Sequence, residues 1–243
     1  GKTRTTEEFA RMAEAAGAEV LIGRCYEGEG APAFWPWVQI LRSYAETRDA
    51  ATLRDELGGS AADVATILPA LRERLPDVQP PPELSPDEAR FRIFEGVTRA
   101  LTRAARSRPL VLLLDDLHGA DMPSLLLLQF LARTLRDARI LVVAAMREVA
   151  LAPGHLVGDT LGELVREQVV APVRLRGLDA AEVAAMVTEV AGTVPSPSLV
   201  AAIHARTEGN PLYVSEIARA LAADGCPEEQ AGKPASSMQL PQS

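Results

Sequence analysis

Residues 110–121 read LVLLLDDLHGAD, and this stretch decides the fold. Its apolar run, residues 110–114, leads directly into two adjacent carboxylates, Asp115 and Asp116. An unbroken apolar run of this length is typical of a strand that is buried on both faces of a parallel sheet. Carboxylates that follow such a strand lie at the carboxyl edge of the sheet, where open α/β folds bind ligands. The stretch therefore predicts an α/β fold with a ligand site beside the acidic pair.

The first residues of the chain add a phosphate-binding pattern to this predicted site. Gly1, Lys2 and Thr3 are the last three letters of the phosphate-loop pattern G-x-x-x-x-G-K-[ST], and a helical stretch follows them. In this pattern the lysine meets the β and γ phosphates, the threonine hydroxyl binds Mg²⁺, and a strand-end aspartate holds the same ion. The chain has 23 arginines and only two lysines, Lys2 and Lys233, so Lys2 stands where a compact ammonium group is needed. The alternative is a surface lysine and a core strand that ends in a solvated aspartate pair.

Composition excludes several classes of protein. The 243 residues are 47% apolar, which is enough for one or two domains with a sizeable core. A net charge of −8 argues against binding of nucleic acid or an anionic membrane by this segment, because phosphate contacts need clustered Lys and Arg. Cys25 and Cys226 form neither a disulfide framework nor a metal-binding spacing. With no long apolar span and no signal-peptide pattern, we expect a cytoplasmic protein without membrane segments.

Strand and helix patterns alternate along the first part of the chain and give way to helices alone. We expect an α/β core over residues 1–176, a region of helices alone over 177–223, which we call the lid, and a disordered tail over 224–243. The predicted strands of the core are 18–25, 110–115, 139–147 and 171–175. The predicted helices of the core are 3–16, one from Pro36, 51–57, 61–75, 86–106, one from Pro123, and 159–168. Ser85 and Glu88 are the N-cap and the capping-box partner expected for the 86–106 helix. The lid is expected to contain helices 180–191, 197–207 and 211–223.

Arg147 ends its predicted strand, just as carboxylates end the strand before it. An arginine at the carboxyl end of a neighbouring strand can reach a γ phosphate and report its presence. The structural alternative is that Arg147 caps the strand and pairs with Glu148. We interpret His118 as a packed or solvent-facing residue, since no Ser, Cys or metal-ligand partner lies at a recognisable spacing. Trp37 is interpreted as a packing residue, with an adenine or substrate contact as the alternative.

As a set, these motifs resemble the signal-transduction (STAND) class of P-loop, AAA-like ATPases, and in particular the ATPase segment of large LuxR-type bacterial regulators and cyclase-linked proteins. The segments that carry this resemblance span nearly the whole chain up to Ala223. They are Gly1-Lys2-Thr3, GRCYEGEGAPAFWPW from Gly23, LLLLDDLHGAD ending at Asp121, Arg147, and EGNPLYVSE from Glu208.

The resemblance implies roles for matching positions. Lys2 and Thr3 are similar to the phosphate and Mg²⁺ residues, with Gly1 beside them in the nucleotide loop. Asp115 is similar to the second Mg²⁺ position, and Asp116 to the acid that orients or deprotonates the attacking water. Arg147 corresponds to the first sensor residue. Pro211 lies in a Gly-Asn-Pro-Leu motif that resembles the lid motif whose proline touches adenine. The implied ligands are ATP or ADP with Mg²⁺.

We therefore expect an ATP-binding and slowly hydrolysing switch module of a larger signalling or transcription-regulatory protein, with output domains outside this segment. Two alternatives remain: a motor or remodelling ATPase that self-associates, and a nucleotide-binding scaffold with negligible turnover. The chain also starts inside the phosphate-loop pattern, which predicts a fragment that lacks its first strand. In that case the strand ending near Arg147 has an unpaired edge, the 171–175 strand lacks its neighbour, and the fragment binds ATP poorly and aggregates.

Overall fold

The computed structural model describes residues 1–26, 28, 30, 32–135, 138–151 and 154–223. These residues form two compact units: one is Lys2–Val173, and the other consists of residues 174–223 together with Gly1. The predicted tail, 224–243, lies outside the described residues. Within the described part of the chain, no helix combines the length and the apolar character that crossing a bilayer requires.

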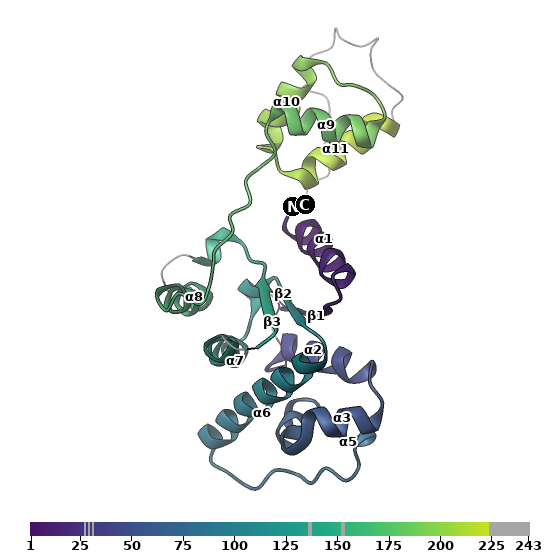
Figure 1. Ribbon diagram of the computed structural model, residues 1–243. Coiled ribbons are helices and arrows are strands. Elements are labelled where there is room, and N and C mark those ends of the chain that lie inside the picture. The colour runs from purple at the N-terminus through teal and green to yellow at the C-terminus, as the bar shows by residue number, and fades with distance from the viewer. Residues whose placement is uncertain (27, 29, 31, 136–137, 152–153, 224–243) are drawn as a thin grey trace. The chain divides into compact units, whose positions relative to one another are not determined.

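The larger unit is built on a parallel sheet of three strands, β1 (Glu19–Arg24), β2 (Leu110–Asp115) and β3 (Ile140–Ala144). The acidic strand β2 lies in the centre and pairs with β1 on one side and β3 on the other. Its residues 110–114 are all buried, because helices cover both faces of the sheet (Figure 1). The predicted α/β fold of the P-loop type is confirmed, with the apolar run as its central strand.

The two faces of the sheet are covered differently. Helix α1 (Lys2–Ala15) packs Ala10 against Val111 and Leu113 on one face. Leu110, Leu112 and Leu114 point to the other face, because side chains alternate along a strand. The larger core on that second face includes residues of α2 (Trp35–Glu46), α6 (Pro86–Ser107), α7 (Met122–Thr134) and α8 (Leu156–Arg166), and of the short helices between α2 and α6.

The segment between α2 and α6 is more broken than the sequence predicts. Helix α3 (Ala50–Leu57) and the short turn η1 (Gly58–Ser60) come first. The single helical piece predicted over 61–75 is wrong, since it forms α4 (Ala61–Ile67) and α5 (Leu71–Arg74). Pro69 explains the break, because proline has no N–H to donate and disfavours helical backbone in the residue before it.

Helix starts follow the capping signals in the sequence. The Ser85 hydroxyl accepts the backbone N–H of Glu88, whose carboxylate accepts the backbone N–H of Ser85, so the predicted capping box of α6 is present. Asp121 caps α7 by accepting the backbone N–H of Ser124 at 2.9 Å. These caps fix the helices that flank β2.

Two strand predictions need correction. The strand predicted over 139–147 ends at Ala144, three residues before Arg147, and the chain then enters the short turn η4 (Glu148–Leu151). Residues 171–175 form no strand, and the side chains of Val173 and Leu175 are 83% and 51% exposed. A strand needs a partner for its backbone groups. Among the described residues, the edge of β3 away from β2 pairs with no other strand.

The smaller unit is a three-helix bundle of α9 (Ala180–Ala191), α10 (Pro197–Thr207) and α11 (Pro211–Ala223). Its core contains Val183, Val187, Val200, Ile203, Val214, Ala218 and Leu221. Before α11 the chain turns tightly at Gly209, which has a φ of +71° and whose carbonyl accepts the backbone N–H of Leu178 at 2.7 Å. A Cβ at Gly209 would lie 2.1 Å from the Leu178 carbonyl oxygen, so only glycine fits there.

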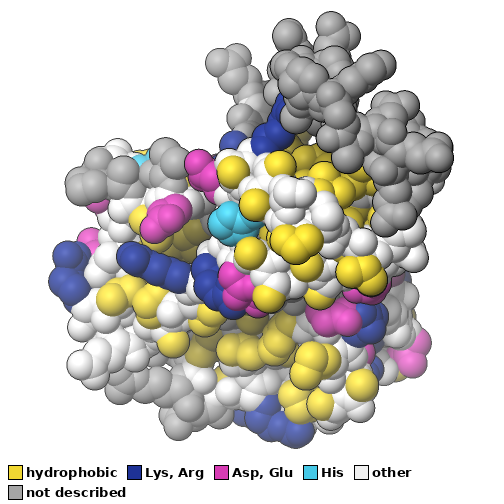
Figure 2. Space-filling model, turned by 90° about the horizontal axis from the view of Figure 1, so that it is seen from above, with side chains coloured by type: hydrophobic (Ala, Val, Ile, Leu, Met, Phe, Trp, Pro, Cys, Tyr) yellow, Lys and Arg dark blue, Asp and Glu magenta, His cyan; other side chains and the backbone are white. Residues whose placement is uncertain are grey.

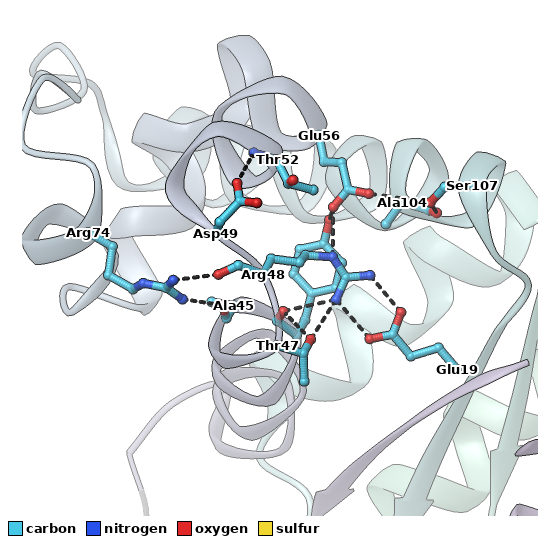
Figure 3. A network of polar contacts seen from close by, with 11 residues as sticks. Glu19, Ala45, Thr47, Arg48, Asp49, Thr52, Glu56, Arg74, Ala104 and Ser107 are labelled. Atoms are coloured by element: carbon cyan, nitrogen blue, oxygen red, sulfur yellow. Dashed lines mark hydrogen bonds and ion pairs between the residues drawn. The ribbon is translucent and has the colours of Figure 1, made fainter.

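A buried polar network closes the amino end of β1 (Figure 3). Arg48 donates to both carboxylate oxygens of Glu19, at 2.6 and 2.8 Å, and to Glu56 at 2.7 Å. The three side chains are 11–13% exposed. The guanidinium also lies 3.6 Å from the centre of the Tyr44 ring, and the Tyr44 hydroxyl donates to Glu56. This network ties β1 to the segments that follow α2.

Candidate functional site

A cavity of about 30 Å³ opens at the carboxyl edge of the sheet, on the face that α1 covers. Its polar walls include Thr3 from the first turn of α1, Asp115 from the end of β2, and Arg24 from the end of β1. Leu113 and Val143 form part of its floor. Residues far apart in the sequence thus meet at the place where parallel α/β folds bind ligands.

The geometry follows from strand alternation and register. Asp115 shares its face of the sheet with Val111 and Leu113, which pack against α1. The Asp115 carboxylate accepts the backbone N–H of Asp116 at 3.1 Å, which orients it at the strand end. The first turn of α1 contains no acidic residue, so its exposed N–H groups favour an anion nearby.

The donor set of this cavity fits Mg²⁺ that is shared with a phosphate ligand. A threonine hydroxyl and a carboxylate are the oxygen ligands that a hard cation prefers. The described residues contain no cluster of three or more His, Cys, Asp or Glu side chains that could hold a metal ion. Mg²⁺ commonly binds through one or two protein oxygens, with water and substrate phosphates completing its shell. Thr3 and Asp115 match this mode of binding.

The other predicted site residues of the larger unit lie outside the cavity lining. Lys2 is exposed at the first position of α1. Asp116 follows β2 with a left-handed φ of +52° and a side chain that is 53% exposed. Arg147 is exposed and follows β3, where the backbone N–H of Leu117 donates to the Ala145 carbonyl at 2.9 Å and extends the pairing of the two strand ends. Gly1 belongs to the other unit.

The acidic pair differs in backbone conformation, and this difference bears on its chemistry. Non-glycine residues with positive φ are uncommon and cluster at ligand sites, although aspartate tolerates this conformation better than most residues. Asp115 ends β2 and reaches the cavity, whereas the positive φ of Asp116 turns its carboxylate toward solvent. His118 Nε2 lies 4.0 Å from Asp116 Oδ1, and the His118 side chain is 9% exposed. His118 is therefore packed, which is one of the two arrangements expected for it.

A larger cavity of about 460 Å³ lies on the opposite face of the same edge, between the segments that follow β1 and β2. Its lining includes Cys25, Trp35, His118 and Asp121. Burial raises the pKa of the Cys25 thiol to about 12, and the nearby carboxylates of Asp121, Asp116 and Asp115 add to this effect. The thiol is therefore uncharged and unreactive at neutral pH. Trp37 is completely buried and donates its indole N–H to the Ser124 carbonyl at 3.1 Å, so its predicted packing role is confirmed.

Sequence reasoning missed Arg24 and the residue that holds it, Gln39. The Gln39 side chain accepts the backbone N–H of Arg24 at 3.4 Å and donates to its carbonyl at 2.8 Å, so an amide group pairs with the free edge of β1. Gly23 packs so tightly on α2 that a Cβ would lie 2.3 Å from the Pro36 carbonyl oxygen. The available signal was a basic residue at the end of a predicted strand, the same signal that marked Arg147.

In the smaller unit, Pro211 is the first residue of α11, and the Asn210 side chain accepts the backbone N–H of Leu212 at 3.1 Å. The following residues, Leu212 and Tyr213, are 62% and 58% exposed. The predicted lid motif thus forms the start of a helix with apolar side chains at its surface.

Charge on the visible surface is mixed. On the face in Figure 2, the described Lys and Arg side chains are scattered among acidic and apolar ones and form no extended basic patch.

Comparison with known proteins identifies the family. Neither the search of curated proteins nor the search of solved structures found a match. The family model described as AAA ATPase domain matches residues 1–143, which is more than half of the chain and includes Lys2, Thr3, β1, β2 and Asp116. This chain therefore belongs to the AAA ATPase domain family.

Proposed function

We propose that this chain is an ATP-binding, slowly hydrolysing switch module of a larger bacterial signalling or transcription-regulatory protein of the STAND class. The observation that carries the proposal is the meeting of Thr3 and Asp115 in one cavity at the start of α1. Their oxygen atoms suit Mg²⁺, and the adjacent helix start suits a phosphate. Family membership supports nucleotide binding and ATPase activity.

In this proposal each site residue has a distinct role. Lys2 and the backbone of Gly1 contact the phosphates, while Thr3 and Asp115 hold the metal position. Bound Mg²⁺ would neutralise charge that develops on the phosphates during transfer. Asp116, which is exposed and directly follows Asp115, orients or deprotonates the attacking water.

Two further residues give the proposed switch its response to the γ phosphate. Arg147 follows the strand next to β2 and senses the γ phosphate, and Pro211 of the smaller unit contacts adenine. Loss of the γ phosphate then changes the relation between core and lid, which is the output of a nucleotide switch. Output domains outside this segment read that change.

The test is Mg·ATP binding by calorimetry with a matched pair of variants in α1. Thr3 and Thr5 are both exposed, but only Thr3 lines the cavity. Thr3→Val should weaken Mg·ATP binding and remove its dependence on Mg²⁺, whereas Thr5→Val should bind as the wild type does. Equal affinities for the two variants would contradict the proposed metal position.

The two alternative functions predict different solution behaviour. A motor or remodelling ATPase needs an arginine from a neighbouring copy, so its turnover rises with protein concentration as it self-associates. A binding scaffold shows affinity without turnover. A switch shows slow turnover that does not depend on self-association. Turnover measured over a range of protein concentrations, with the mass in solution followed in parallel, separates the three.

A further inference from the structure

Arg24 lies at the proposed nucleotide site in a position that its neighbours fix. It is the last residue of β1 and pairs in register with Asp115, the last residue of β2. Its side chain lines the cavity together with Thr3 and Asp115, on the α1 face of the sheet. The Gln39 amide holds both backbone polar groups of Arg24, and the close contact of Gly23 with Pro36 blocks the opposite face.

Arg24 also differs in its ion pairing from several other arginines of the larger unit. Arg48 is engaged by Glu19 and Glu56, and several exposed arginines have carboxylate partners, as Arg54 has in Asp77. In the part of the chain that the structure describes, no carboxylate oxygen lies within 4.0 Å of the Arg24 guanidinium. An exposed guanidinium beside a cavity, with its donors available, suits an anion that brings several oxygen atoms.

We propose that Arg24 is a phosphate-contacting residue, whose guanidinium binds terminal phosphate oxygens of Mg·ATP from the β1 side of the Thr3–Asp115 cavity. This inference rests on the proposed ATP-binding function. A planar guanidinium can donate two parallel hydrogen bonds to a phosphate, and lysine cannot reproduce that geometry. Arg24 then offsets the negative charge that Asp115 and the phosphates bring to the same edge of the sheet.

The test compares Arg24→Ala and Arg24→Lys with a control, Arg139→Ala. Arg139 is exposed and immediately precedes β3, at the opposite edge of the sheet. Calorimetry is carried out on the full chain with Mg·ATP, AMP and inorganic tripolyphosphate. Arg24→Ala should weaken Mg·ATP and tripolyphosphate by roughly 10- to 100-fold, as expected for hydrogen bonds to a charged group, and should leave AMP affinity unchanged. Arg24→Lys should lie between the wild type and Arg24→Ala, and Arg139→Ala should match the wild type.

The possible failures are distinguishable. If Arg24→Ala binds Mg·ATP as tightly as the wild type while Thr3→Val loses affinity, the inference about Arg24 is wrong and the proposed function stands. An equal loss for ATP and AMP would also overturn it, because only ATP carries the terminal phosphates. If the chain extended at its amino end by a strand and a Gly-rich loop binds none of the three ligands, the proposed function itself fails, and the inference fails with it.

Discussion

Both ends of β1 carry charged side chains. At one end these side chains are buried and paired, and at the other end they are exposed. At the amino end, Glu19 lies in a buried network in which Arg48 satisfies two carboxylates. At the carboxyl end, Arg24 is exposed beside a cavity, next to Asp115. Buried charges need partners because desolvation is costly, whereas a charge at an open edge can keep its donors for a ligand. The difference separates the end of the strand that stabilises the fold from the end that is suited to binding.

The largest effect is expected at the carboxyl edge of the sheet, where Asp116 follows β2. In the role proposed for Asp116, Asp116→Asn removes a water-orienting acceptor and leaves Thr3 and Asp115 unchanged. Turnover should fall by about 10²–10⁴-fold, the range typical of general base catalysis, while Mg·ATP affinity stays the same. Single-turnover kinetics with calorimetry measure both quantities. Unchanged hydrolysis would show that this carboxylate does not have the proposed role.

At the amino end of β1, the expected effect is on the stability of the fold. Arg48→Ala leaves Glu19 and Glu56 buried without their cation, and this kind of loss costs about 3–5 kcal/mol of unfolding free energy. Urea denaturation measures it. The control is Arg54→Ala, whose ion pair with Asp77 is exposed on both sides and should contribute little. A small effect of Arg48→Ala would mean that the network at the amino end of β1 contributes little to the stability of the fold.

Adding one methyl group near the carboxyl end of β1, on the face that packs against α2, should also lower the stability of the fold. Gly23→Ala places a Cβ against the Pro36 backbone, which must shift to accommodate it. Overpacking of this kind costs about 1–3 kcal/mol in a denaturation experiment. Gly162→Ala in α8 is the control, because a Cβ there meets nothing within 4 Å. Equal stabilities of the two variants would show that β1 and α2 are not held so closely.

Stability at alkaline pH tests the burial of Cys25. Its pKa is raised to about 12, so its favourable contribution is fully present below the ordinary thiol pKa of about 8.5 and is lost as pH rises toward 12. Wild-type stability should therefore fall with pH more steeply than that of Cys25→Ala, by up to about 1.4 kcal/mol per pH unit. Urea denaturation at pH 8, 9 and 10 measures the slopes. Parallel curves would mean that the thiol titrates as a solvated group.

The smallest effect is expected for Arg147, which follows the neighbouring strand β3. If Arg147 senses the γ phosphate, Arg147→Ala should weaken ATP more than ADP, by about tenfold, which corresponds to about 1.4 kcal/mol. The control is Arg139→Ala, because Arg139 precedes the other end of β3. Equal losses of ATP and ADP affinity would favour a structural role for Arg147.

The sequence by itself determined the parts whose signals are local. The apolar run 110–114 predicted the central strand, and the Ser85–Glu88 pair predicted the start of α6, because burial pattern and capping act over a few residues. The acidic pair and the first residues of the chain also marked the candidate site before its geometry was known. The same kind of signal predicted a strand over 139–147 that is longer than the observed β3, and a strand over 171–175 that does not form. A strand depends on a partner that is distant in the sequence, which a local signal does not contain.

Only the tertiary structure decided which of the marked residues meet. Strand register places Arg24 beside Asp115, and alternation turns both toward Thr3, while Asp116 faces solvent. The side-chain amide of Gln39 fixes the edge of β1 from another element. These relations join residues that are between 15 and 112 positions apart in the chain, as for Arg24 with Gln39 and Thr3 with Asp115. No local pattern encodes them, because face and register are settled only when the helices and the sheet pack together.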